Sequence, residues 1–192
     1  MFPSIRVITN GIIKVPEAFD HVLFVSVDGE ENTNDSIRGK GTFSKVMNNY
    51  SGDKRVVINM TIYRKNYREL ERVVKLAKEH NFRGVVCNLY TPTCGTTSPL
   101  FITKEERTFI IEELRRVKLL YPKTFLLTRS MIRWYEFPDH RGYCYWGDGV
   151  LHFDASWNAR RCFSNHADCA HCGCLAGARQ SPFKVPYLWL KG

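Results

Sequence analysis

The sequence lacks the features that mark membrane, exported and repeat proteins. No stretch approaches the roughly 20 consecutive apolar residues that a membrane-spanning helix needs, so such a helix is excluded. The first residues, MFPSIRVITNG, include no long apolar segment and no small-residue cleavage site, so no signal peptide is predicted. No linker, low-complexity segment or internal repeat stands out. We therefore expect a folded chain in the cytoplasm, where thiols stay reduced.

Acidic residues are scarcer than basic ones, and this imbalance sets the charge of the chain. The chain has 19 Asp and Glu residues and 28 Lys and Arg residues, which gives a formal net charge of +9. A basic chain can bind nucleic acid when its charges form a patch. Here the basic residues are scattered and are densest in the helical stretches Arg64–Arg72 and Arg107–Lys118. This distribution is typical of solvated helix faces, so nucleic acid is not an expected partner.

Apolar runs alternate with amphipathic segments over the first two-thirds of the chain. We predict strands at Ile5–Thr9, Val22–Val27, Arg55–Ile62, Gly84–Leu89 and Thr124–Thr128. Helices are predicted over Thr42–Tyr50, from Asn66 and from Thr103, with Thr42 and Asn66 as caps and a T-x-x-E capping box at Thr103. The polar segment Asp28–Gly41 is predicted to consist of turns. This alternation predicts an α/β fold with a parallel sheet, either open or curled into a barrel.

Polar side chains lie inside or directly after the predicted apolar strands. They are Ser26, Asp28, Asn59, Thr61 and Asn88. In parallel α/β folds, binding and chemistry occur at the carboxyl ends of the strands. Polar groups in such strands need hydrogen-bond partners, which neighbouring loops or a ligand can supply. Because all five residues are expected at the same edge of the predicted sheet, we expect them to line a ligand site.

Five of the seven cysteines fall in one C-terminal stretch. They are Cys144, Cys162, Cys169, Cys172 and Cys174, and the last three read C-A-H-C-G-C. Such closely spaced thiols are typical of a metal site or an iron–sulfur cluster, and four thiolates suit zinc as well as [4Fe–4S]. Helical periodicity stops near Glu136, and Val150–Phe153 is predicted to be one arm of a hairpin. We therefore predict an α/β domain over residues 1–135 and a small Cys-rich module over residues 136–192.

A series of short motifs resembles one enzyme family. The series is T-N-G at Thr9–Gly11, V-S-V-D-G at Val25–Gly29, D-x-I-R-G-K-G-T-F at Asp35–Phe43, N-M-T-I at Asn59–Ile62 and N-Y-R-E-L at Asn66–Leu70. In this order the motifs resemble the third to fifth strands of radical S-adenosylmethionine (radical SAM) enzymes. The tail is similar to the auxiliary-cluster extensions of these enzymes, known as SPASM and twitch domains, although the one-residue gap between Cys172 and Cys174 departs from their spacing.

The resemblance implies a fold, two cofactors and a set of contacts. The fold is a partial (β/α) barrel that lacks its first strands. Ser26, Asp28 and Arg38 would contact the ribose or methionine end of S-adenosylmethionine, and Asn59, Thr61 and Asn88 would contact its adenine or ribose. The tail would hold an auxiliary [4Fe–4S] cluster, with zinc as the alternative metal. Its expected ligands are Cys144, Cys162, Cys169 and Cys172, while Cys174 replaces one of them or stays free, and His166 or His171 can also ligate.

Two motifs of that family are not found in this sequence. It contains neither the C-x-x-x-C-x-x-C loop, which holds the catalytic cluster, nor G-G-E-P. We therefore expect the C-terminal portion of an enzyme that is inactive alone, with the missing N-terminal portion or a split-gene product as its partner. The catalytic residues and the substrate, whether small molecule or peptide, are open. The alternative is a zinc-binding structural or interaction module on an α/β scaffold.

Overall fold

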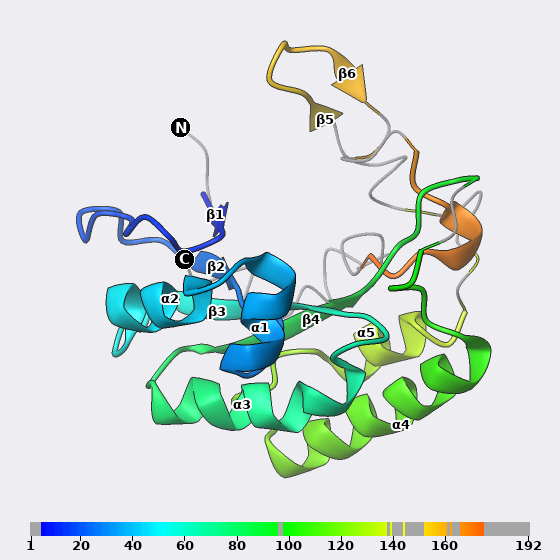
Figure 1. The fold of residues 1–192 in the computed structure, drawn as a ribbon, viewed down its shortest axis with the longest axis horizontal. Helices are drawn as coiled ribbons and strands as arrows, with labels where there is room; N and C mark the ends of the chain where they lie inside the picture. The colour runs from blue at the N-terminus through cyan, green and yellow to red at the C-terminus, as the bar shows by residue number, and fades with distance from the viewer. Residues whose placement is uncertain are drawn as a thin grey trace.

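The computed structural model describes residues 5–95, 98–137, 139, 144, 152–160, 162 and 166–174 (Figure 1). Its main sheet consists of β1 (Val7–Thr9), β2 (Leu23–Ser26), β3 (Val56–Ile62) and β4 (Gly84–Leu89). The four strands are parallel and lie side by side in chain order. The predicted α/β class with a parallel sheet is confirmed.

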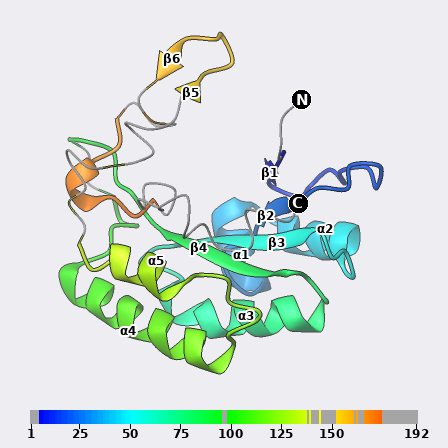
Figure 2. The ribbon, with the colours of Figure 1, turned by 180° about the vertical axis from the view of Figure 1, so that it is seen from behind.

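Helices follow the strands and cover one side of the sheet. They are α1 (Glu31–Arg38), α2 (Thr42–Tyr50), α3 (Leu70–Glu79), α4 (Lys104–Leu120) and α5 (Arg129–Trp134), with the 3₁₀ turns η1 (Tyr67–Glu69) and η2 (Cys169–His171). Because the strand order never reverses and parallel crossovers are right-handed, successive crossovers place their helices on the same face. Figures 1 and 2 show α3 and α4 in a layer beneath the strands.

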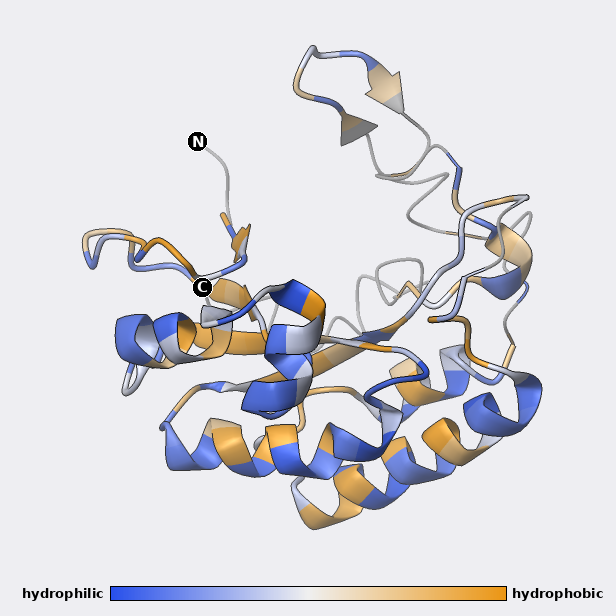
Figure 3. Cartoon of the chain, viewed as in Figure 1, coloured by the Kyte–Doolittle hydropathy of each residue, from blue (hydrophilic) through white to orange (hydrophobic). Residues whose placement is uncertain are grey.

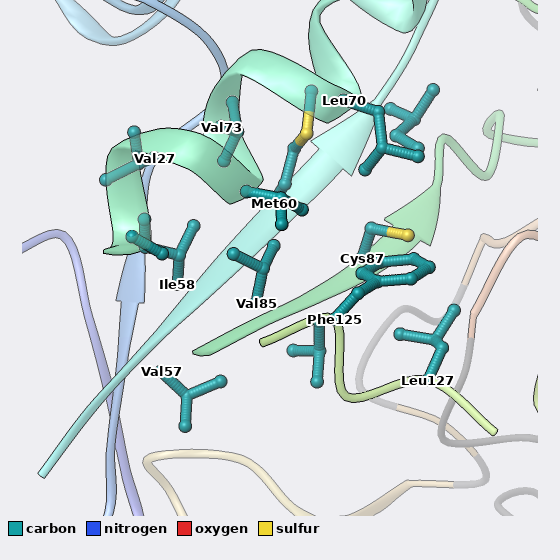
Figure 4. Packing of buried hydrophobic residues seen from close by; sticks show 14 of the residues in the cluster. Val27, Val57, Ile58, Met60, Leu70, Val73, Val85, Cys87, Phe125 and Leu127 are labelled. Carbon is teal, nitrogen blue, oxygen red and sulfur yellow. The ribbon is translucent and has the colours of Figure 1, made fainter. Parts of the chain in front are cut away.

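The core lies between that helical layer and the sheet. Along β2, β3 and the end of β4, fully buried apolar residues alternate with half-buried ones, so one face of the sheet packs against helices. The helix α3 buries Leu70, Val73, Val74 and Ala77, which recur at helical spacing, while its other face is polar (Figure 3). Figure 4 shows Val73 with Ile58, Met60 and Cys87 in this core. Each fully buried Val or Leu side chain contributes about 1.5–3 kcal/mol.

Several predicted elements occur as expected. The strand Gly84–Leu89 and the helix Thr42–Tyr50 have the predicted bounds. Thr103 forms the predicted capping box with Glu106 at the start of α4. One arm of the predicted hairpin is present as β5 (His152–Phe153), which pairs with β6 (Ala159–Arg160) and stands apart from the α/β layers in Figures 1 and 2.

The segment between β2 and α2 was wrongly predicted to consist of turns. It contains the helix α1, whose only large apolar residue is Ile37, so hydrophobic periodicity gave no signal. The cap predicted at Thr42 is also wrong, because Gly41 is the N-cap and makes no side-chain bond. The carboxylate of Asp35 instead accepts hydrogen bonds from the backbone N–H groups of Gly41 and Phe43. A residue of α1 thus satisfies the first free N–H groups of α2.

Two further predictions are corrected by tertiary contacts. The helix predicted from Asn66 is present as η1 followed directly by α3, but the Asn66 side chain makes no capping hydrogen bond to it. The segment Thr124–Thr128 forms no strand and pairs with the sheet only through a parallel bridge between Phe125 and Val85. It leads instead into α5, which begins with Thr128 as its N-cap. None of the helices that the structure describes is long and apolar enough to cross a membrane.

Candidate functional site

The face of the sheet opposite the helices carries a band of polar side chains. Ser26 is paired in register with Asn59, and Thr61 is paired with Asn88. Residues paired in register on neighbouring strands share a face, so these four side chains lie side by side. The amide of Asn88 donates to the side-chain oxygen of Asn59 at 3.0 Å. The strand register thus places four of the five predicted polar residues on one face of the sheet.

A cavity of about 380 Å³ lies where this band reaches the carboxyl ends of the strands. Four of the six residues predicted to bind a cofactor line it, namely Ser26, Asp28, Arg38 and Thr61. Asn59 and Asn88 are not among its lining residues. The remainder of the lining is Asn10, Ile12, Asn34, Ile37, Thr42, Val46, Tyr63, Tyr90 and Leu100. The volume falls within the range of roughly 300 to 1,000 Å³ that is usual for small-molecule sites.

Asp28 is the most heavily bonded charged group of the cavity. Its side chain is 2% exposed, and one carboxylate oxygen accepts from the backbone N–H of Thr61 at 2.8 Å. The other oxygen lies 2.7 Å from a guanidinium nitrogen of Arg38 and accepts from the hydroxyl of Tyr63 at 3.3 Å. Burial raises the pKa of Asp28, while Arg38 and the hydrogen-bond donors oppose that rise. The carboxylate thus joins the ends of β2 and β3 to α1.

Arg38 is held by Asp28 but keeps one unused donor. Its side chain is 25% exposed, and its Nε is buried without a hydrogen-bond partner. A buried N–H left unpaired costs about 1–3 kcal/mol, so an oxygen atom from a ligand in the cavity would stabilise it. The ion pair also cancels the charge of both residues, which leaves a polar but nearly neutral lining.

Two buried asparagines fix the backbone around Asp28, and sequence reasoning missed them as site residues. Asn34 accepts from the backbone N–H of Asp28 at 3.0 Å and donates to the hydroxyl of Thr42 at 3.1 Å. Asn66 donates to the carbonyls of Asp28 and Thr61. An isolated asparagine carries no periodic signal, so only the three-dimensional structure shows that these amides are fully used.

Tyr63 and Tyr90 were also missed, although the sequence held a usable signal. Side chains in a strand alternate between faces, so the polar face of β3 continues from Asn59 through Thr61 to Tyr63. In the same way, the face of Asn88 continues to Tyr90. Both tyrosines line the cavity. Burial and the neighbouring Asp28 raise the pKa of Tyr63 above its usual value, so its hydroxyl stays protonated.

The tail segment that includes Cys172 and Cys174 lies next to the end of β4. Cys172 is buried, Cys144, Cys162 and Cys174 are half-buried, and Cys169 is exposed. Burial raises the pKa of Cys172, and the nearby thiols of Cys144 and Cys169 raise it further. Soft thiol donors suit zinc or an iron–sulfur cluster. Within the described part of the chain, however, no three His, Cys, Asp or Glu side chains form a group that could hold a metal ion.

The other histidines and cysteines considered as metal ligands or free thiols contact protein groups in the tail and in the core. His171 bonds the carboxylate of Asp168 at 2.7 Å, which fits a surface histidine. His166 accepts, through its backbone carbonyl, a hydrogen bond from the backbone N–H of Cys94. The core position predicted for Cys87 is confirmed, and burial raises the pKa of its thiol. Cys94, which had no evident partner in the sequence, lies beside the tail with its thiol 3.5 Å from the carbonyl of Ala167.

Comparison with known proteins assigns no family to the chain. It matches no protein-family model, and no curated protein matches it either. The cavity and the cysteine-rich tail are therefore interpreted from their own chemistry and from the motif series in the sequence.

Proposed function

We propose that the chain is the C-terminal portion of a radical SAM enzyme. In this proposal the sheet is part of a (β/α) barrel, and the cavity at its carboxyl edge binds S-adenosylmethionine. The cysteine-rich tail carries an auxiliary [4Fe–4S] cluster. When bound with a catalytic cluster, S-adenosylmethionine supplies the 5′-deoxyadenosyl radical that abstracts hydrogen from a substrate. The C-x-x-x-C-x-x-C loop for that catalytic cluster would come from a further polypeptide segment or a partner chain.

The observation that carries this proposal is the meeting of Ser26, Asp28, Arg38 and Thr61 around one cavity. The resemblance of the motif series implies the same four residues as contacts of S-adenosylmethionine. A sheet whose strands follow chain order, with helices on one face and polar groups on the other, also supports a barrel wall.

The lining offers groups suited to a nucleoside that carries an amino acid. The hydroxyls of Ser26 and Thr61 can donate to and accept from ribose hydroxyls. The unpaired Nε of Arg38 can donate to a carboxylate. Asp28 is engaged by three donors, so its main task is to hold Arg38 and β3 in place. The apolar side chains of the lining can pack against the adenine ring.

Ligand binding to the full chain tests the cavity. We expect S-adenosylmethionine and 5′-deoxyadenosine to bind in equilibrium dialysis, and Thr61→Val to weaken binding about 5- to 10-fold through the loss of one hydrogen bond. Thr108→Val is the matched control, because Thr108 is exposed on α4 and does not line the cavity. Failure of both ligands to bind, or unchanged binding by Thr61→Val, would overturn the proposed function.

Metal analysis of anaerobically purified protein tests the tail. About four irons with sulfide and brown colour are expected for a [4Fe–4S] cluster. One zinc per chain without colour would instead support the alternative, a zinc-binding structural or interaction module. The two experiments have different readouts, because one measures ligand binding at the cavity and the other measures metal content.

A further inference from the structure

The loop after β4 forms one wall of the cavity, and its described residues are 90–95 and 98–101. Tyr90 and Leu100, near the two ends of this loop, both line the cavity. Ser98 joins them, because its hydroxyl oxygen accepts from the hydroxyl of Tyr90 and from the backbone N–H of Leu100, each at 3.2 Å. The shape of this wall therefore depends on where the loop as a whole is held.

The tail segment 166–174 lies beside the first half of that loop (Figures 1 and 2). The backbone N–H of Cys94 donates to the carbonyl of His166 at 2.7 Å, and the N–H of Asp168 donates to the carbonyl of Pro92 at 2.8 Å. The residues that lie between these two hydrogen bonds form an antiparallel bridge. The tail segment and the loop thus exchange main-chain hydrogen bonds as neighbouring strands of a sheet do.

Gly173 contacts both residues that flank Tyr90. Its N–H donates to the hydroxyl of Thr91 at 2.9 Å, and its carbonyl accepts from the backbone N–H of Leu89 at 2.9 Å. A Cβ atom on Gly173 would stand 2.1 Å from the carbonyl oxygen of Leu89. No side chain fits there, so the close approach of the tail segment to the end of β4 depends on glycine at this position.

The tail segment is itself fixed to two helices. The carbonyl of Cys172 accepts from the side chain of Arg107 on α4 at 3.2 Å, and the carbonyl of Cys174 accepts from the indole N–H of Trp134 on α5 at 3.2 Å. Both helices bury apolar residues in the core. The tail segment therefore connects the wall of the cavity to the packed interior of the fold.

We propose that the tail segment 166–174 positions the wall of the ligand cavity, with Thr91 and Gly173 as positioning residues. Neither residue is among the described lining residues of the cavity, so both act through Tyr90, which lies between Leu89 and Thr91. This inference rests on the proposed function in that the cavity binds a nucleoside ligand. A wall that is ordered before the ligand arrives gives up less conformational entropy when the ligand binds.

Coupling between the tail segment and the cavity acts in both directions. If a docked tail segment raises the affinity of the cavity for its ligand, the bound ligand stabilises the docked tail segment by the same factor. A tail segment that only covers the end of β4 would contribute to stability and leave the affinity unaltered. Ligand affinity and hydrogen exchange of the tail segment therefore distinguish these two roles.

Equilibrium dialysis of S-adenosylmethionine and 5′-deoxyadenosine with the full chain measures the affinity. Thr91→Val removes the hydroxyl that accepts from Gly173 and should weaken binding about fivefold, while Thr91→Ser keeps a hydroxyl and should bind like the wild type. Gly173→Ala should weaken binding about tenfold or more, because its Cβ displaces the segment from Leu89. Thr108→Val, on the exposed face of α4, is the control and should match the wild type.

Hydrogen exchange of the full chain, followed by mass spectrometry, reports on the wall directly. Without ligand, we expect the loop after β4 to exchange faster in Gly173→Ala than in the wild type or in Thr108→Val. In the wild type, we expect bound ligand to slow exchange in the tail segment 166–174, although the ligand does not touch it.

The outcomes separate this inference from the proposed function. If the wild-type chain binds a ligand and both Thr91→Val and Gly173→Ala bind it equally well, the inference is refuted while the proposed function stands. If the wild-type chain binds neither ligand, the proposed function is refuted, and hydrogen exchange decides the inference. Faster exchange of the loop in Gly173→Ala then supports positioning of the wall, and unchanged exchange refutes it. Circular dichroism of each variant shows whether a loss of binding reflects loss of the fold.

Discussion

Replacing Arg38 by methionine would leave the buried carboxylate of Asp28 without its cation. Methionine keeps most of the aliphatic stem, so the change removes charge and hydrogen bonding rather than packing. Breaking a buried ion pair by removing one partner costs about 3–5 kcal/mol. Because the side chain of Arg38 is 25% exposed, water can solvate part of the vacated site. We therefore expect the free energy of unfolding at pH 7 to fall by about 2–3 kcal/mol.

The penalty should depend on pH in a defined direction. Arg38 lowers the pKa of Asp28 against the effect of burial, so its removal raises that pKa further. A carboxyl group with a raised pKa in the folded state destabilises the fold once it ionises, and this cost grows as pH rises through the raised value. The variant should thus regain stability relative to the wild type as pH falls toward about 4, the pKa of an unperturbed aspartate.

Urea denaturation followed by far-UV circular dichroism at pH 7, 5.5 and 4.5 measures both effects. Arg72→Met is the matched control, since Arg72 forms an exposed ion pair with Glu30. Such surface pairs contribute about 0–1 kcal/mol, so this variant should lie close to the wild type at each pH. The reasoning is refuted if Arg38→Met costs no more than Arg72→Met at pH 7, or if its penalty is the same at all three pH values.

Two further predictions concern side chains outside the cavity lining. The Tyr50 hydroxyl accepts from the N–H of Val15 and donates to the carbonyl of Ile13. Tyr50→Phe should therefore lower the free energy of unfolding, measured in urea melts, by about 1 kcal/mol. An unchanged urea midpoint would contradict this prediction. Glu71, whose pKa is lowered to about 2 chiefly by its hydrogen bond to Arg116, stabilises the fold above about pH 4.5 and loses this effect as pH falls toward 2. The difference in thermal midpoint between wild type and Glu71→Gln should therefore be largest at neutral pH and shrink on acidification, and a constant difference would contradict the assignment.

The strands and long helices could be predicted because burial dictates their pattern. The segment Gly84–Leu89 is apolar over its length since it lies inside the sheet, and α3 repeats its apolar residues every three or four positions. The helix α1 could not be predicted, because polar contacts rather than buried apolar residues hold it in place. It is attached by polar contacts such as those of Asn34 and Asp35, and such contacts follow no sequence period.

The part of the candidate site that lies on the strands could be predicted from the sequence, because the sheet itself could be predicted. Strand ends carry their residues to one edge, so Ser26 and Thr61 could be expected to meet. The pairing of Arg38 with Asp28 could not be derived, because it depends on how α1 folds back over β2. The anchoring of the tail was equally hidden, since it requires Gly173 to lie against Leu89 across 84 positions of the sequence.

The cavity and the tail segment Cys172-Gly173-Cys174 both contact consecutive residues of the loop after β4. Tyr90 lines the cavity, and Thr91 accepts the hydrogen bond from the N–H of Gly173. Leu89, just before them, donates to the carbonyl of Gly173, while the N–H of Tyr90 donates to Ile62 of β3. A displacement of the Cys172-Gly173-Cys174 segment therefore cannot leave the end of β4 unchanged. Because interiors are close-packed, a shift of that segment would also move Tyr90 in the wall of the cavity.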